Sequence, residues 1–147
     1  MPSVYIATGY KNRDAYAKAR ALAHRYGLGV SFDWTLHEPP PPHQRIDRNG
    51  FLTWASKAEL AGVRAADLVL VLLPGGLGTH TELGMALSLG KPVVIYAPRP
   101  ELLEELNGDP PCLFYGMAKE LTSDWADVEA FLKGYSGRAG KGAEDGR

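Results

Sequence analysis

The chain has 147 residues, of which 45% are apolar, with 16 basic and 17 acidic side chains and a formal net charge of −1. A chain of this size can bury one core, and its balanced charge excludes a strongly basic surface for duplex nucleic acid or an anionic membrane. The single cysteine, Cys112, excludes an intramolecular disulfide and is typical of a reducing compartment. Without a long apolar run or a signal-like N-terminus, we expect a single-domain cytoplasmic protein.

The first elements alternate between strand and helix. Residues 4–8 form an apolar, β-branched run that predicts a strand, and apolar positions at helical spacing predict a helix over 13–26, closed by Gly27. Residues 30–34 predict the second strand. Four consecutive prolines within 35–50 exclude a regular helix or central strand there, so this segment is expected to be a loop.

The second half continues the alternation through six further elements. In chain order the pattern predicts helix 53–66, strand 67–73, helix 79–89, strand 92–97, strand 112–115 and helix 123–132. Thr53 and Thr79 are expected to cap the two helices that they begin. The polar segment 134–147 predicts a disordered tail that follows a single domain over 1–133.

This order predicts the fold class. Apolar strands that alternate with helices predict a single-domain α/β sandwich, doubly wound and flavodoxin- or Rossmann-like, around a mostly parallel five-stranded sheet. Ligands of such sheets bind at the carboxyl ends of the strands, near the switch point. That edge carries Gly9, Tyr10, Trp34 and the turn over 74–78, so we expect the functional site there.

The turn over 74–78 contains three glycines between a buried strand and a helix. Gly75, Gly76 and Gly78 let the backbone approach a ligand, and the free N–H groups of the first helical turn, near Thr79, favour an anion. The spacing is neither that of a P-loop nor GxGxxG. The turn therefore predicts a phosphate site, and a tight strand-to-helix turn without a ligand is the alternative.

Glu82 follows this turn, one turn into the helix, and its side chain can point back toward the phosphate edge. An acidic residue in a first turn ordinarily compensates the helix dipole. A carboxylate beside an anion site, however, places a nucleophile within reach of the sugar of a 5′-phosphate. Glycosyl transfer needs that arrangement, so we interpret Glu82 as the candidate nucleophile.

Two further side chains are candidates for substrate binding. Arg13 adds positive charge just after the first strand, and Trp34 offers a ring on which a base can stack. His37, His43 and His80 lack matching ligands, so neither a metal nor another cofactor is expected. The candidate binding residues are Gly9, Arg13, Trp34, Gly75, Gly76, Gly78 and Thr79.

The order of these motifs resembles the nucleoside 2-deoxyribosyltransferase superfamily, which includes 2′-deoxynucleoside 5′-phosphate N-hydrolases and CMP N-glycosidases. The likeness spans about residues 3–97. The motifs that carry it are the run 4–9, Glu59 before 66–69, Gly78-Thr79, Glu82-Leu83-Gly84-Met85-Ala86 and Gly90-Lys91-Pro92.

The resemblance implies roles for three catalytic candidates. Glu82 would attack C1′, Tyr5 would hold the Glu82 carboxylate, and Glu59 would protonate the departing base or contact the substrate. The family usually has an Asp at the position of Glu59, and a solvated acid on an Ala-rich helix is the alternative there. A retaining mechanism needs one ionised nucleophile and one acid, which a pair of carboxyls supplies.

The resemblance also bears on the substrate and the assembly. Six positions before the nucleophile, family transferases that act on free nucleosides have an Asp, and the monophosphate hydrolases have a Ser. Gly76 at this position favours a monophosphate, because a carboxylate would repel the phosphate. The family also implies a homodimer, with a small-molecule nucleotide or nucleoside as the only other partner and neither nucleic-acid polymer nor membrane.

The predicted function is thus an N-glycosidase of nucleoside 5′-monophosphates that works through a glycosyl-Glu82 intermediate. Three alternatives stay open. One is a nucleoside 2-deoxyribosyltransferase, and another is a cytokinin-activating phosphoribohydrolase, because residues 74–82 also fit the PGGxGTxxE signature of those enzymes. The third is a nucleotide-binding or sensing module that turns nothing over.

Overall fold

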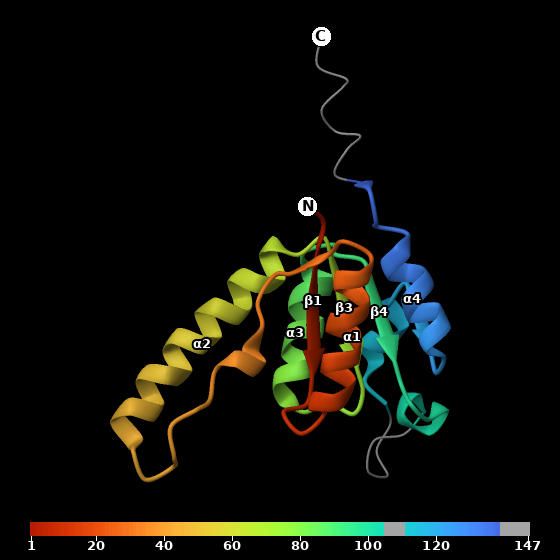
Figure 1. The fold of residues 1–147 in the computed structure, drawn as a ribbon. Helices are drawn as coiled ribbons and strands as arrows, with labels where there is room; N and C mark the ends of the chain where they lie inside the picture. Colours follow the sequence, from red (N-terminus) through yellow and green to blue (C-terminus); the bar gives the residue numbers. More distant parts are fainter. Residues whose placement is uncertain (105–110, 139–147) are drawn as a thin grey trace.

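The computed structural model describes residues 1–104 and 111–138, which form a sheet covered by helices on both faces (Figure 1). The strands are β1 (Ser3–Thr8), β2 (Gly29–Val30), β3 (Leu68–Leu72), β4 (Val93–Tyr96) and β5 (Glu120–Thr122). The α-helices are α1 (Arg13–Arg25), α2 (Arg45–Ala65), α3 (Leu77–Ser88) and α4 (Trp125–Lys133). Short 3-10 helices are η1 (Trp34–Leu36), η2 (Pro100–Leu103) and η3 (Leu113–Met117).

All five strands are parallel and lie in the order β2-β1-β3-β4-β5. This is the flavodoxin-like doubly wound order, with its switch point between β1 and β3. The predicted fold class is therefore confirmed, and the sheet of the described residues is parallel throughout rather than mostly parallel.

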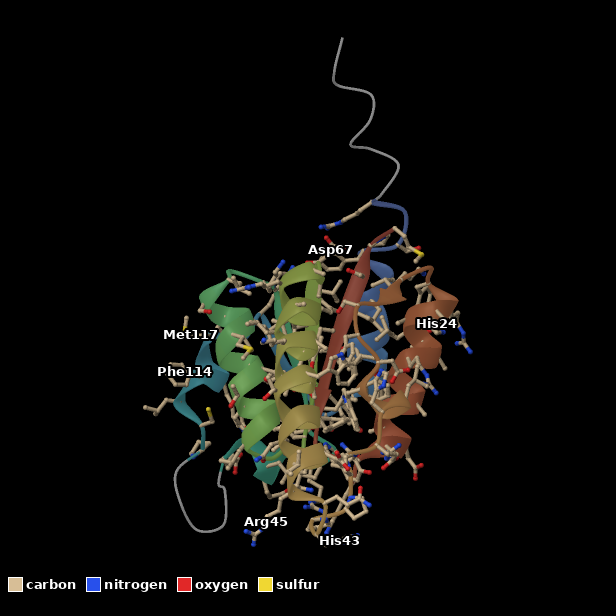
Figure 2. All side chains as sticks on the ribbon, turned by 90° about the vertical axis from the view of Figure 1, so that its left-hand side faces the viewer. His24, His43, Arg45, Asp67, Phe114 and Met117 are labelled. Atoms are coloured by element: carbon tan, nitrogen blue, oxygen red, sulfur yellow. The ribbon has the colours of Figure 1, made fainter. Side chains whose placement is uncertain are left out.

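The alternation of side chains along β1 decides which residues face the site. Val4 and Ile6 point into the core that α1 and α4 cover, whereas Tyr5 and Ala7 point into the core beneath α2 and α3. Figure 2 shows α2 and α3 side by side over this second face. Tyr5 is therefore on the same side of the sheet as the two helices that carry Glu59 and Glu82.

Close backbone approaches fix α2 and the strand ends in place. A Cβ atom added at Gly62 would lie 2.7 Å from Cβ of Phe32 and 3.0 Å from the Tyr5 ring, so α2 packs directly on β1 and the segment after β2. Thr8 pairs with Leu72 in the register of β1 and β3. The turns that follow these two strands therefore meet at the carboxyl edge of the sheet.

Two predicted boundaries near the proline-rich segment are wrong. The second strand was expected over 30–34, but β2 ends at Val30 because the Asp33 side chain accepts hydrogen bonds from Thr35 and Arg20 and caps η1. The loop was expected to continue to residue 50, but α2 begins at Arg45, with Gln44 rather than Thr53 at its N-cap. Among residues 45–52 only Arg45, Arg48 and Leu52 are strong helix formers, so helix propensity alone does not predict the early start of α2.

The last predicted strand is also wrong. Residues 112–115 do not join the sheet: Cys112 precedes η3, in which only Tyr115 is buried. The fifth strand is instead Glu120–Thr122, a short edge strand without the apolar pattern by which the other strands were predicted. Of the expected tail, residues 134–138 are described, with Tyr135 packed against the core, and 139–147 lie outside the described residues. Within the described chain, no helix combines the length and apolarity needed to cross a bilayer.

Candidate active site

A cavity of about 320 Å³ opens at the carboxyl edge of β1 and β3, where the fold class places ligands. Its walls come from the end of β1, the start of η1, the middle of α2 and the first turns of α3. The lining residues are Thr8, Gly9, Tyr10, Trp34, Glu59, Gly76, Gly78, Thr79 and Glu82. The structure thus brings together most of the predicted site.

Glu82, which lines this cavity, forms a buried pair with Tyr5. The Tyr5 hydroxyl donates a hydrogen bond of 2.7 Å to Oε1 of Glu82, and the two residues are 0% and 7% exposed. Burial raises the pKa of Glu82 to about 8; the Tyr5 hydrogen bond opposes this rise and the nearby Glu59 carboxylate adds to it. Burial also raises the pKa of Tyr5, so the phenol stays a donor.

Glu59 reaches the same cavity from α2. Desolvation raises its pKa above the ordinary value, and its interaction with Glu82 opposes that rise. Burial and the neighbouring Glu59 both favour the protonated form of Glu82, so the two carboxyls hold a shared proton more tightly than an isolated glutamate would. A pair of neighbouring carboxyls that shares a proton can supply one nucleophile and one acid.

The three glycines of the turn have different surroundings. Within the described chain, no atom lies within 4 Å of a Cβ added at Gly76 or Gly78, and both residues line the cavity. A Cβ added at Gly75 would lie 2.4 Å from Cγ2 of Thr79, and Gly75 is not among the residues that line this cavity. Gly75 is therefore required by packing, whereas Gly76 and Gly78 leave room and backbone N–H groups for a ligand.

The start of α3 corrects one sequence expectation. The helix begins at Leu77 with Gly76 as N-cap, so Thr79 is a buried residue of the first turn and not the cap. Among the described atoms, no side chain caps this helix. The first N–H groups of an α-helix have no partner within the helix, which leaves this end free to receive an anion.

His80 and Tyr115 brace this turn from outside the cavity. His80 Nδ1 lies 2.8 Å from the carbonyl oxygen of Gly76, and Nε2 lies 2.7 Å from the Tyr115 hydroxyl. Because a carbonyl only accepts, Nδ1 carries the proton and Tyr115 donates to Nε2. This role of Tyr115 was not predicted from the sequence, because the residue was expected to lie on a strand.

Of the two predicted binding side chains Arg13 and Trp34, only Trp34 lines the cavity. Arg13 does not line the cavity: it forms an ion pair of 2.8 Å with Glu38 and lies over the Tyr10 ring. Trp34 does line it, and its Nε1 donates to the Ile6 carbonyl at 3.3 Å. Thr8 and Tyr10 also line the cavity and were not predicted as ligands, although both flank Gly9 at the end of the first strand.

Across residues 1–104 and 111–138, no three or more His, Cys, Asp or Glu side chains gather in a position to hold a metal ion. The functional groups at the cavity are its two carboxyls and the backbone of the glycine turn, with the Tyr5 phenol hydrogen-bonded to Glu82.

The flavodoxin-like sheet places the buried Glu82 carboxyl and the half-buried Glu59 carboxyl beside the N-terminus of α3, a site suited to an α/β enzyme that transfers glycosyl groups or cleaves glycosidic bonds. Comparison with family models identifies it further. The model of the nucleoside 2-deoxyribosyltransferase family matches residues 4–125, so the chain belongs to that family, and the predicted resemblance is confirmed.

Two solved structures share the fold. One is a 2-deoxyribosyltransferase from Bacillus psychrosaccharolyticus, with a TM-score of 0.66, 23% identity, and coverage of 88% of this chain and 95% of that chain. The other is a CMP N-glycosidase from Clostridium botulinum, with a TM-score of 0.56, 14% identity, and coverage of 88% and 97%. A search of curated proteins found no match.

Proposed function

We propose that this enzyme hydrolyses the N-glycosidic bond of a nucleoside 5′-monophosphate through a covalent glycosyl-Glu82 intermediate. The observation that supports this most directly is the Glu82 carboxyl itself, which is buried, accepts a 2.7 Å hydrogen bond from Tyr5, and lines a cavity that the glycine turn also lines. A nucleophile and an anion site in one cavity suit a nucleotide, whose sugar carries the base on C1′ and the phosphate on C5′.

The carboxyl pair accounts for both chemical steps. Transfer of the shared proton from Glu82 to Glu59 leaves Glu82 ionised, with the Tyr5 hydroxyl holding its Oε1. Glu82 then attacks C1′, the C1′–N bond breaks, and its electron pair leaves on the base, which takes the proton from Glu59. In the second step Glu59 accepts a proton from water, whose oxygen attacks C1′ and releases Glu82.

The glycine turn supports a monophosphate as the substrate. Gly76 and Gly78 present backbone and no side chain to the cavity, and the first turn of α3 carries the positive end of the helix dipole. Among the similar structures, the Clostridium botulinum protein is named for CMP, a nucleoside monophosphate. An Asp at position 76 would place a negative charge where the phosphate is proposed to bind.

Transfer of the glycosyl group to a second base is the other candidate. The family name and the TM-score of 0.66 to a 2-deoxyribosyltransferase favour it. The two reactions share the glycosyl-Glu82 intermediate and differ only in whether water or a base attacks it.

We also propose that the enzyme is a cytoplasmic homodimer. Cys112 is a free cysteine, as expected in a reducing compartment. The exposed apolar side chains of Leu113, Phe114 and Met117 gather on η3, beside α3, where Figure 2 labels two of them. Exposed apolar patches of this kind are typical of protein interfaces. Light scattering will measure the mass in solution.

The experiment that tests the proposed reaction is chromatography of the bases released from ribo- and deoxyribonucleoside 5′-monophosphates and from the matching nucleosides. Release from monophosphates without an added base supports the hydrolase. Release that requires a second base supports the transferase, and binding without release supports a sensing module. Release from ribonucleotides of adenine only would favour the phosphoribohydrolase.

A further inference from the structure

A second cavity, of about 200 Å³, opens beside the catalytic cavity and shares Tyr10, Trp34 and Glu59 with it. We call this second cavity the aromatic chamber. The remaining walls come from the segment after β2 and from the N-terminal half of α2: Phe32, His37, Pro39, Arg48, Phe51, Leu52, Trp54 and Ala55. The chamber thus adjoins the catalytic cavity, and three side chains line both.

Four rings of the chamber, those of Phe32, His37, Phe51 and Trp54, form one connected cluster. Phe32 and His37 stack with centroids 5.6 Å apart and planes 5° apart, and Trp54 meets His37 edge-on at 4.8 Å. Phe51 lies 5.9 Å from Trp54. Even so, Trp54 remains 46% exposed, so the cluster keeps apolar ring surface open to a ligand. Aromatic faces and edges of this kind bind flat apolar groups.

Two contacts hold parts of the chamber wall in place. Gly62 lets α2 approach Phe32 so closely that an added Cβ would lie 2.7 Å from Cβ of Phe32. The Arg48 side chain, which also lines the chamber, hydrogen-bonds the Pro40 carbonyl oxygen and so ties α2 to the proline-rich segment. In Figure 2, His43 and Arg45 mark this end of α2, at the same edge of the molecule as the carboxyl ends of the strands.

Glu59 lies between the catalytic cavity and the chamber, and its position indicates which part of a substrate can reach the chamber. Glu59 lines both cavities, and the proposed function gives it the proton that the departing base receives. The base must therefore lie next to Glu59, and a group that extends from the base past Glu59 enters the chamber. The catalytic cavity alone, at about 320 Å³, is near the lower limit of the roughly 300–1,000 Å³ that small-molecule sites occupy.

We propose that the substrate is a nucleoside 5′-monophosphate whose base carries a flat apolar substituent, and that this substituent occupies the aromatic chamber. The inference rests on the proposed function, because the proposed chemistry places the base beside Glu59. Within the chamber, Trp54 is the specificity-determining residue: it contacts the proposed substituent and takes no part in bond cleavage.

Calorimetry on the Glu82→Gln protein tests this inference without turnover. The probes are adenosine 5′-monophosphate and its N6-benzyl derivative, together with cytidine 5′-monophosphate and its N4-benzyl derivative. At least one benzyl compound is expected to bind about tenfold or more tightly than its parent, since apolar groups in a fitted pocket give such ratios. Adding Trp54→Ala should remove this preference and leave the affinity for the parent compound unchanged.

Two further variants make the test specific. Ala55→Phe fills the chamber and should also remove the preference, while Leu121→Ala, which changes an exposed apolar residue on β5, should keep it. Equal affinity for benzyl and parent compounds, or a preference that survives both Trp54→Ala and Ala55→Phe, overturns the inference. Failure of the proposed function shows separately, as absence of base release from every compound by the wild type.

Discussion

The Tyr5 hydroxyl donates a 2.7 Å hydrogen bond to Oε1 of Glu82 across 77 positions of sequence, joining β1 to α3 beneath the cavity. Both residues are buried, so the hydrogen bond is shielded from water. Burial raises the pKa of the Glu82 carboxyl to about 8, and the hydrogen bond from Tyr5 opposes this rise. The phenol thereby favours the ionised form that a nucleophile requires.

Tyr5→Phe is expected to lower activity at neutral pH. The Tyr5 hydrogen bond opposes the rise in the pKa of Glu82 that burial causes. Without this donor the pKa of the Glu82 carboxyl rises further, and less of it is ionised at pH 7. The rising limb of kcat/KM against pH should shift to higher pH. As a control, Tyr26→Phe removes a half-buried tyrosine hydrogen bond, to Glu129, on the other face of the sheet and should leave the limb in place. An unchanged limb in Tyr5→Phe would contradict the role given to Tyr5.

Glu82→Gln is expected to change the pH dependence of stability. The folded-state pKa of Glu82, about 8, lies above its ordinary value of 4.5, so the native state binds the proton more tightly than the unfolded state. Its contribution to stability is complete below about pH 4.5 and is lost as the pH rises through about 8, by up to about 1.4 kcal/mol per pH unit. Glu82→Gln lacks this loss. Urea unfolding at pH 5 and pH 8 should show that the free energy of unfolding falls less for the variant than for the wild type between these pH values. An equal fall in both proteins would refute the raised pKa of Glu82.

Gly76→Asp is expected to fold and to bind monophosphates poorly. In the described structure a Cβ at position 76 meets no atom within 4 Å, so the side chain enters the cavity without steric conflict. Its charge repels the phosphate, so KM for a monophosphate should rise by about tenfold or more while KM for the nucleoside changes little. Gly76→Ala is the matched control for size. Equal effects of Asp on both substrates would place the phosphate elsewhere.

Tyr115→Phe is expected to loosen the glycine turn while leaving the carboxyl pair intact. The variant removes the hydroxyl that donates to His80 Nε2, and His80 in turn holds the Gly76 carbonyl. We expect KM for the monophosphate to rise by a factor of about 3–10, the range of one lost neutral hydrogen bond, with kcat little changed. A fall in kcat at constant KM would show that Tyr115 acts on the chemistry and not on the turn.

Much of the fold follows from local patterns, because strands such as Leu68–Leu72 are apolar throughout and the glycines at 27 and 90 follow helix ends. The errors lie where tertiary context overrides pattern. Glu120–Thr122 joins the sheet edge with one exposed apolar residue, and Cys112 precedes a 3-10 helix. A single sequence gives no signal for either outcome.

The candidate site divides in the same way. The glycine turn and Glu82 stand out by spacing, and the family resemblance supplied Tyr5 and Glu59 as its neighbours. Spacing did not separate Gly75, which packing requires, from Gly76, which faces the cavity. The contact of His80 with Tyr115 joins residues 35 positions apart, and only the folded chain shows it.

Mass spectrometry of the enzyme quenched with acid during turnover of a nucleoside 5′-monophosphate tests the central claim most directly. The account predicts an adduct with the mass of the sugar phosphate, located on the peptide that contains Glu82 and absent from Glu82→Gln. Base release by the wild type with no adduct on that peptide, or turnover retained in Glu82→Gln, would contradict a covalent glycosyl-Glu82 mechanism.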